Sequence, residues 1–117
     1  MASFNKVSIP SSQARAELHD SLSLTGAEIS INNLPAGTGV PFVHAHKQNE
    51  EIYAILSGSG RAEIDGETVS LAAGDWLRIS PEARRQFFAS EDTALSFICI
   101  QVKVHSLESY TKDDAIV

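Results

Sequence analysis

Two histidines that are separated by a single residue are the side chains of this sequence best suited to chemistry. His44 and His46 lie in the stretch GVPFVHAHKQNEEIYAILSG, which runs from Gly39 to Gly58. Side chains at positions i and i+2 of a strand point to the same face, so both imidazoles can reach one metal ion. Glu51 follows five residues after His46, and a neighbouring strand that begins there would bring its carboxylate back to the imidazoles.

The chemistry of this trio favours a transition metal. Two neutral imidazoles and one carboxylate form a ligand set that suits Fe, Mn, Ni or Zn and leaves coordination positions open. The spacing is not decisive by itself, because two histidines separated by one residue also occur as ordinary surface side chains. The metal hypothesis therefore depends on the elements that position the three residues.

Glycine and proline divide the middle of the chain into short segments whose composition is typical of strands. These expected strands are 27–34, 51–58, 60–65, 67–71, 75–80, 85–89 and 94–104. Asp65-Gly66 stands between two alternating runs and predicts a tight hairpin turn. Seven or more short strands with turn residues between them predict an all-β fold, an antiparallel sandwich or barrel.

The two ends of the chain differ from this central part. In the segment 1–26, Ser11 or Ser12 can cap a short helix over SQARAELHDSL, because that stretch is rich in helix formers. The expected barrel spans 27–104. The remainder, 105–117, is mostly polar and acidic, and we expect a tail that is flexible or packs on a neighbour.

Size and charge exclude several classes of protein. The chain has 117 residues, enough for one domain with one core. Nine Lys and Arg against fifteen Asp and Glu give a net charge of −6, which argues against nucleic-acid and anionic-lipid partners. The one cysteine, Cys99, cannot form an internal disulfide, and no apolar run reaches membrane-span length. We expect a cytoplasmic protein.

The stretch from Gly39 to Gly58 resembles the first motif of the cupin superfamily, G(X)5HXH(X)3-4E(X)6G, with one residue fewer between Gly39 and His44. Downstream, GRAEIDGETVSL followed by AAGDWLRISP is similar to the region between the cupin motifs and the start of the second motif. The resemblance covers most of the chain. It implies a single-domain cupin β-barrel of the jelly-roll type, also called a double-stranded β-helix, which agrees with the expected strands.

The resemblance implies that His44, His46 and Glu51 are metal ligands. Glu50 is the alternative carboxylate, because the motif allows a shorter gap after the second histidine. Only Glu51 also has the six-residue spacing to Gly58.

The second motif departs from the family pattern. Counted from Gly74, the histidine that normally supplies the fourth metal ligand falls on Arg85, and a shift of one residue places Arg84 or Gln86 there. A guanidinium has no lone pair for a cation. Two outcomes follow: three protein groups hold the metal, or the metal has been lost and the pocket carries a fixed positive charge. Arg85 would bind a substrate carboxylate or phosphate, or Arg84 and Arg85 form only a solvated turn.

These observations predict a small cupin-domain protein that binds a divalent metal and acts on or binds a small anionic metabolite. The alternative is a non-catalytic ligand-binding or sensor cupin without metal. Tyr53, Arg78 and Arg85 are the expected substrate-binding residues; Tyr53 lies on the same strand face as Glu51. The resemblance also implies a homodimer. Neither the reaction nor whether the protein is an enzyme follows from the sequence.

Overall fold

The fold is built around one long strand, β3. The computed structural model describes residues 3–110 and 113–117, and in them it contains seven strands and no helix. The strands are β1 (Arg15–Glu17), β2 (Glu28–Leu34), β3 (Asn49–Ile64), β4 (Glu67–Ala72), β5 (Trp76–Ile79), β6 (Arg85–Ala89) and β7 (Leu95–Lys103). The fold is therefore all-β, as the sequence predicts.

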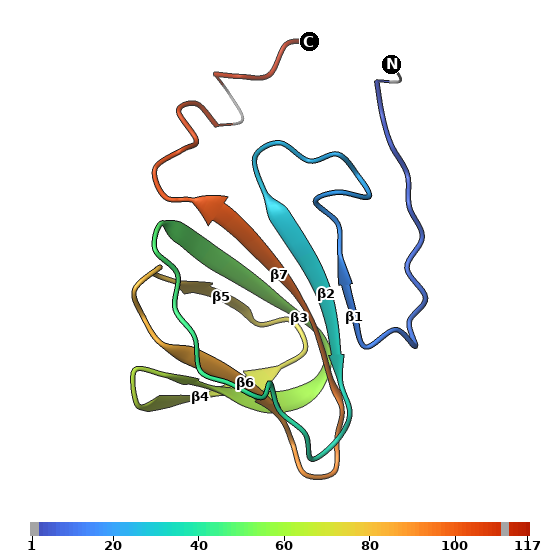
Figure 1. The fold of residues 1–117 in the computed structure, drawn as a ribbon, viewed down its shortest axis with the longest axis vertical. Coiled ribbons are helices and arrows are strands. Elements are labelled where there is room, and N and C mark those ends of the chain that lie inside the picture. The colour runs from blue at the N-terminus through green and yellow to red at the C-terminus, as the bar shows by residue number, and fades with distance from the viewer. Residues whose placement is uncertain (1–2, 111–112) are drawn as a thin grey trace.

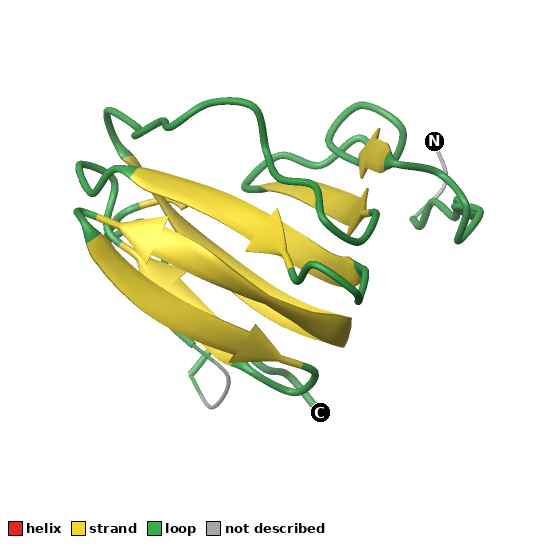
Figure 2. Cartoon of the chain, turned by 90° about the horizontal axis from the view of Figure 1, so that it is seen from below, coloured by secondary structure: helices red, strands yellow, loops and turns green. Residues whose placement is uncertain are grey.

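β3 belongs to both layers of the barrel. Its first half pairs with β7 and β5, and β7 continues through β2 to β1 at the edge. Its second half pairs with β4 on one side and β6 on the other. All of these pairings are antiparallel. Figure 1 shows β3 running from the side of β5 and β7 toward β4 and β6, and Figure 2 shows the strands arranged in layers.

The core lies between these layers and is rich in aromatic side chains. The rings of Tyr53 and Phe87 stack with centroids 4.2 Å apart, and those of Phe87 and Phe97 stack at 5.2 Å. Ala62 and Leu95 are completely buried. Such offset aromatic contacts add to the stabilisation that comes from burying apolar area. The core cluster draws residues from β3, β4, β5, β6 and β7.

Gly58 marks the place where β3 bends from one layer to the other. The register between β3 and β7 shifts between Ile55 and Ser57, which indicates a bulge. Gly58 follows with φ of +83°, and a Cβ there would lie 1.7 Å from the carbonyl oxygen of Ala94. Only glycine fits this position, both for its backbone angle and for the close approach of the neighbouring chain.

Most of the expected strands are confirmed, with small shifts at their ends. The segments 51–58 and 60–65 are one continuous strand rather than two. The hairpin at Asp65-Gly66 is present, and both residues have positive φ, 49° and 83°, as a type I′ turn requires.

The expected helix near the N-terminus is wrong. Arg15–Glu17 forms β1 and pairs with β2, and the residues from Gln13 to Leu22 contain no helix, only a turn closed by the Leu22 N–H and the Leu18 carbonyl. The physical reason is an alternating pattern: Ala16 and Leu18 are buried on one face, whereas Arg15 and Glu17 face the other way. Tertiary pairing with β2 outweighs the helix propensity of these residues.

No helix of the described residues is long and apolar enough to cross a membrane. Cys99 is a free thiol buried on β7.

Candidate metal centre

The two histidines lie on an extended segment that crosses β6. The backbone of His44 forms a single bridge with Arg85: the His44 N–H donates to the Arg85 carbonyl at 3.1 Å, and the Arg85 N–H donates back at 2.9 Å. The His46 N–H donates to the Pro81 carbonyl at 2.7 Å. The sequence places the pair on a regular strand, and the structure instead holds it by these separate contacts. The two rings lie 5.1 Å apart, nearly perpendicular.

Glu51 completes a cluster with the two histidines. Its side chain is 4% exposed and points from β3 toward both rings. Nε2 of His46 lies 3.0 Å from Oε2 of Glu51, and Nε2 of His44 lies 4.0 Å from Oε1. One potential ligand atom from each of the three residues lies within 4.8 Å of the others. The structure thus brings together the three residues that the sequence predicts as ligands.

The Glu51 carboxylate accepts hydrogen bonds from two buried side chains. The Tyr53 hydroxyl donates to Oε1 at 2.6 Å, and the Cys99 thiol donates to Oε2 at 3.3 Å. Burial by itself would raise the pKa of Glu51, but these hydrogen bonds and the charges of His46 and Arg85 outweigh it. The pKa of Glu51 is therefore lowered, and the group is ionised at neutral pH.

The neighbouring groups stay neutral. Burial lowers the pKa of His44, and this outweighs the attraction of its cation to Glu51. Burial and the Glu51 charge raise the pKa of Cys99 to about 12, and burial also raises the pKa of Tyr53. Tyr53 and Cys99 therefore remain hydrogen-bond donors to Glu51 at neutral pH.

These properties fit a divalent metal. Metal ligands must be deprotonated, and the site offers an ionised carboxylate and an imidazole that resists protonation. The side chains of His44 and His46 are partly exposed to the cavity described below, whereas Glu51 is buried at its floor. A metal held here would have protein on one side and an open side for a small molecule.

Arg85 lies behind the cluster and is fully buried. Its Nη1 atom is 3.5 Å from Oε1 of Glu51, and its Nη2 atom donates to the Ser80 carbonyl. Nε and Nη1 have no hydrogen-bond partner among the described residues. Arg85 does not line the cavity. Its position allows it to compensate the Glu51 charge within the protein.

The neighbours of Arg85 resolve the alternatives that the sequence leaves open. Arg84 is exposed in the turn, where its backbone N–H donates to Asp65 at 2.8 Å. The Gln86 amide donates to the Val40 carbonyl at 2.7 Å. The residue opposite His44 is therefore Arg85, and the solvated-turn interpretation holds for Arg84 alone.

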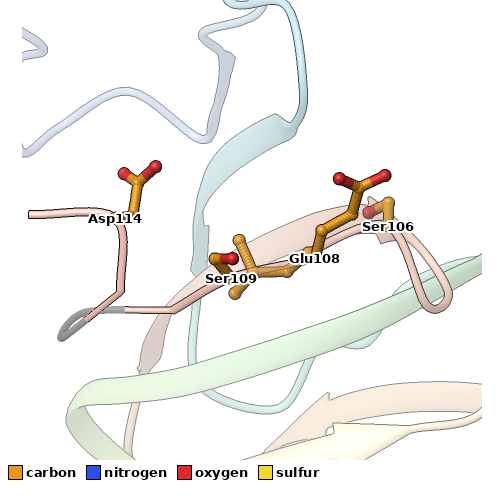
Figure 3. Close-up of a pocket in the computed structure, with 5 residues that line it drawn as sticks. Ser106, Glu108, Ser109 and Asp114 are labelled. Carbon is orange, nitrogen blue, oxygen red and sulfur yellow. The ribbon is translucent and has the colours of Figure 1, made fainter.

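A cavity of about 730 Å³ opens above the cluster. Its floor includes Glu51, Tyr53 and Cys99, and its mouth includes the exposed ring of Phe42. Tyr53 thus lines the cavity. A second hollow, of about 320 Å³, lies in the C-terminal segment, and the described residues that line it are Ser106, Leu107, Glu108, Ser109 and Asp114 (Figure 3).

Arg78 and Glu50 lie outside the cavity. Nε of Arg78 is 2.7 Å from Oε1 of Glu50, and this ion pair is partly exposed on the opposite face of the sheet. The alternation of a strand explains this arrangement, since Glu50 and Glu51 must point to opposite faces. Glu51, not Glu50, is the carboxylate that faces the histidines.

Sequence reasoning missed two residues of the cavity, Arg15 and Asn32. Both line it, and Arg15 Nη1 donates to Oδ1 of Asn32 at 2.6 Å. The signal was present in the alternation of Arg15 and Glu17 with Ala16 and Leu18, which is the pattern of a half-buried strand. The same residues are good helix formers, so local propensity predicts a helix there instead.

Residues 31–101 match the model of the cupin domain family. The chain belongs to the cupin family. A crystal structure of a cupin protein from Bacteroides fragilis is 62% identical, with a TM-score of 0.96 over 100% of this chain and 98% of that one. A second crystal structure, described as a predicted oxalate decarboxylase from Thermotoga maritima, is 28% identical, with a TM-score of 0.61 over 65% of each chain.

A curated relative of this cupin, an uncharacterised protein of Methanocaldococcus jannaschii, is 29% identical over 75 residues. The match covers 64% of this chain and 59% of that protein, so this cupin spans less than two thirds of the relative's length. These comparisons establish the jelly-roll fold and the family.

Proposed function

We propose that this cupin binds one divalent transition metal through His44, His46 and Glu51 and receives a small anionic molecule in the cavity above it. The observation that carries the proposal is the convergence of the three ligand atoms within 4.8 Å at the floor of a 730 Å³ cavity. Fe, Mn, Ni and Zn all suit this ligand set. When bound, such a metal would act as a Lewis acid toward an oxygen of the small molecule.

The protein groups around the metal have distinct tasks in this proposal. Tyr53 and Cys99 donate hydrogen bonds to Glu51 and fix the orientation of its carboxylate. Arg85 compensates the charge of Glu51 from behind. The rings of Phe42, Phe87 and Phe97 line the cavity and exclude water from part of it.

The metal proposal is tested by metal analysis of purified protein loaded with Zn, Mn, Fe or Ni. We expect about one metal per chain in the wild type and a loss of binding in a variant with His44→Ala and His46→Ala. The matched control replaces His19 and His105, which are both exposed and far from the cluster in the chain, and should keep the metal. Equal metal content in both double variants would refute the proposal.

A matched pair of variants tests which glutamate, Glu51 or Glu50, binds the metal. Glu51→Gln removes a ligand charge at the cluster, whereas Glu50→Gln changes the adjacent residue, which faces Arg78. We expect metal affinity to fall by at least about tenfold for the first and to stay unchanged for the second. A metal that depends on Glu50 instead would contradict the geometry.

One observation favours a second candidate, a ligand-binding cupin without metal. Glu51 already accepts hydrogen bonds from Tyr53 and Cys99 and lies close to His46 and Arg85, so its charge is compensated without a metal ion. In this case a bound organic anion would raise the melting temperature equally with and without a chelator. A chelator-sensitive rise supports the metal centre.

A further inference from the structure

Arg15 provides the cavity with a fixed positive charge. Among the described residues that line the cavity, it is the only lysine or arginine. It reaches the cavity from β1, at the outer edge of the layer that carries Glu51. A guanidinium stays protonated at any accessible pH, so this charge is present whatever the state of the histidines.

The guanidinium is held in place by a buried polar pair. Asn32 is 7% exposed and Ser30 is 4% exposed. The Asn32 amide donates to the Ser30 hydroxyl at 3.0 Å, and its oxygen accepts from Nη1 of Arg15 at 2.6 Å. Burying polar groups is costly unless they are hydrogen-bonded. This arrangement turns the amide oxygen toward Arg15 and orients the guanidinium in advance of any ligand.

Part of the guanidinium remains available to a ligand. Nε lies at the limit of hydrogen-bond distance, 3.5 Å, from Oε1 of Glu17, and both side chains are more than half exposed. Exposed pairs of this kind contribute little energy. Nη2 contacts no acceptor in the part of the chain that the structure describes.

We propose that Arg15 binds a carboxylate of the ligand whose other end meets the metal centre. This inference rests on the proposed function and names the chemical class of the ligand. Guanidinium and carboxylate match in charge and in planar geometry. A single arginine beside the acidic Glu17 suits a carboxylate better than a phosphate dianion, which would call for more positive charge.

The sheet also limits the size of the ligand. β2 and β7 lie between β1 and β3, and the register aligns Arg15 with Ile55 of β3, four residues from Glu51. The backbones of Arg15 and Glu51 therefore stand about 14 Å apart across the strands and about 13 Å along them, or about 19 Å on a flat sheet. The side chain of Arg15 extends into the space between the two backbones from one end, and the side chains that would hold the metal extend into it from the other. A compact dicarboxylate of about four carbons, such as succinate, is therefore a suitable probe.

The test uses calorimetric titration of succinate into the zinc-loaded and the metal-free protein. Succinamide, which has the same shape without charge, serves as the neutral probe, and inorganic phosphate serves as the other anion. We expect the wild type to bind succinate and to bind both comparison probes more weakly. Arg15→Gln should weaken succinate binding by about tenfold or more, and Arg15→Lys should weaken it less.

Arg61 offers a closely matched control. It lies on β3 outside the cavity, and its Nε atom is 3.4 Å from Oε1 of Glu63, an arrangement that mirrors Arg15 and Glu17. Arg61→Gln removes the same charge and should leave succinate binding unchanged. Glu17→Gln should strengthen binding, because it removes the negative charge beside Arg15.

The outcomes separate this inference from the proposed function. Zinc content measured on the same samples reports the metal centre, and Arg15→Gln should keep it. Succinate binding that is equal in Arg15→Gln and wild type, or absent from the wild type in both forms, overturns the role of Arg15. A wild type that binds no zinc refutes the metal proposal. The titration of succinate into metal-free protein still tests the role of Arg15 in that case.

Discussion

The backbones of His44 and Arg85 exchange two hydrogen bonds, at 3.1 and 2.9 Å, so Arg85 stands directly opposite the first metal-ligand candidate. The side chain of Arg85 then lies 3.5 Å from Glu51. The position that carries a fourth ligand in the family motif is therefore occupied by a cation that compensates the Glu51 carboxylate.

Removal of the Arg85 charge should destabilise the protein. Arg85→Met leaves the buried Glu51 carboxylate without its cation, and breaking a buried pair costs about 3–5 kcal/mol. Arg84→Met, at the exposed neighbour, should change stability by less than about 0.5 kcal/mol. Urea unfolding of the two variants measures the difference. Similar stabilities would show that Arg85 is not needed to compensate Glu51.

Arg85→His should strengthen metal binding. An imidazole at this position would stand opposite His44 and add a third nitrogen donor, and so a fourth potential ligand, to the cluster. Competition with a chromogenic chelator gives the metal affinity of the wild type and the variant. Arg85→Gln, which removes the charge without adding an imidazole, separates the gain of a ligand from the loss of the cation. Weaker binding in Arg85→His than in Arg85→Gln would contradict this geometry.

Gly58 should not tolerate a side chain. Gly58→Ala adds both a positive-φ strain and a collision with the carbonyl of Ala94, and we expect a loss of about 2 kcal/mol or more. Gly66 has the same φ, +83°, but open space around it, so Gly66→Ala reports the strain alone. Thermal unfolding should give a clearly lower Tm for the first variant. Equal Tm values would mean that β7 can move away.

Stability should fall in alkaline solution. The Cys99 pKa is raised from 9.0 to about 12, so above pH 9 the unfolded chain loses its thiol proton while the folded chain keeps it. The stabilising contribution is present below pH 9 and decreases by about 1 kcal/mol per pH unit up to about 12. Urea unfolding with chelator at pH 8 and 10 measures this. Between pH 8 and pH 10, the Cys99→Ala variant should lose less stability than the wild type. An equal loss in both proteins would show that Cys99 is not the cause.

The homodimer expected from the sequence should form through the outer face of the β7–β3–β5 layer. By register, Ile52, Ile98 and Ile100 share that face with Trp76, which is 69% exposed. The charges nearest to it, Glu50 and Arg78, pair with each other, so two copies of this acidic chain can approach there without repulsion.

Light scattering after size exclusion tests this dimer. Trp76→Glu should convert it to a monomer, whereas Leu107→Glu, at an exposed residue of the C-terminal segment, should not. A monomeric wild type contradicts the dimer, and dissociation only by Leu107→Glu places the contact at that segment.

The sequence predicts the strands well because each is bounded by residues with strong local preferences. Gly66 shows this at the turn between β3 and β4, where it adopts a positive φ that other residues avoid. Gly58 has the same φ inside β3, so there the sequence predicts a strand end that the structure does not have. The N-terminal segment is different, because its helix formers have no strong apolar stripe. Pairing with β2, which is remote in sequence, decides its structure, and local propensity cannot reveal that.

The three residues of the cluster, His44, His46 and Glu51, are predictable from the sequence because their spacing matches a family motif, and strand alternation turns Glu51 rather than Glu50 toward the histidines. The surroundings of the cluster are not. Arg85 fits the pattern of a rim residue in the sequence, yet it is 0% exposed, because β6 alternates and turns it inward behind Glu51. Arg15 reaches the cavity because β1 pairs with β2, and this pairing cannot be predicted from local sequence.

The short length of β1 has a consequence for how this protein can diversify. Only three register pairs attach it to the rest of the sheet, at an edge that no other described strand covers. Substitutions in β1 would change the side chains that line the cavity and leave the cluster of His44, His46 and Glu51 undisturbed. Selectivity and reactivity would then evolve, or be engineered, as separable traits of one small barrel.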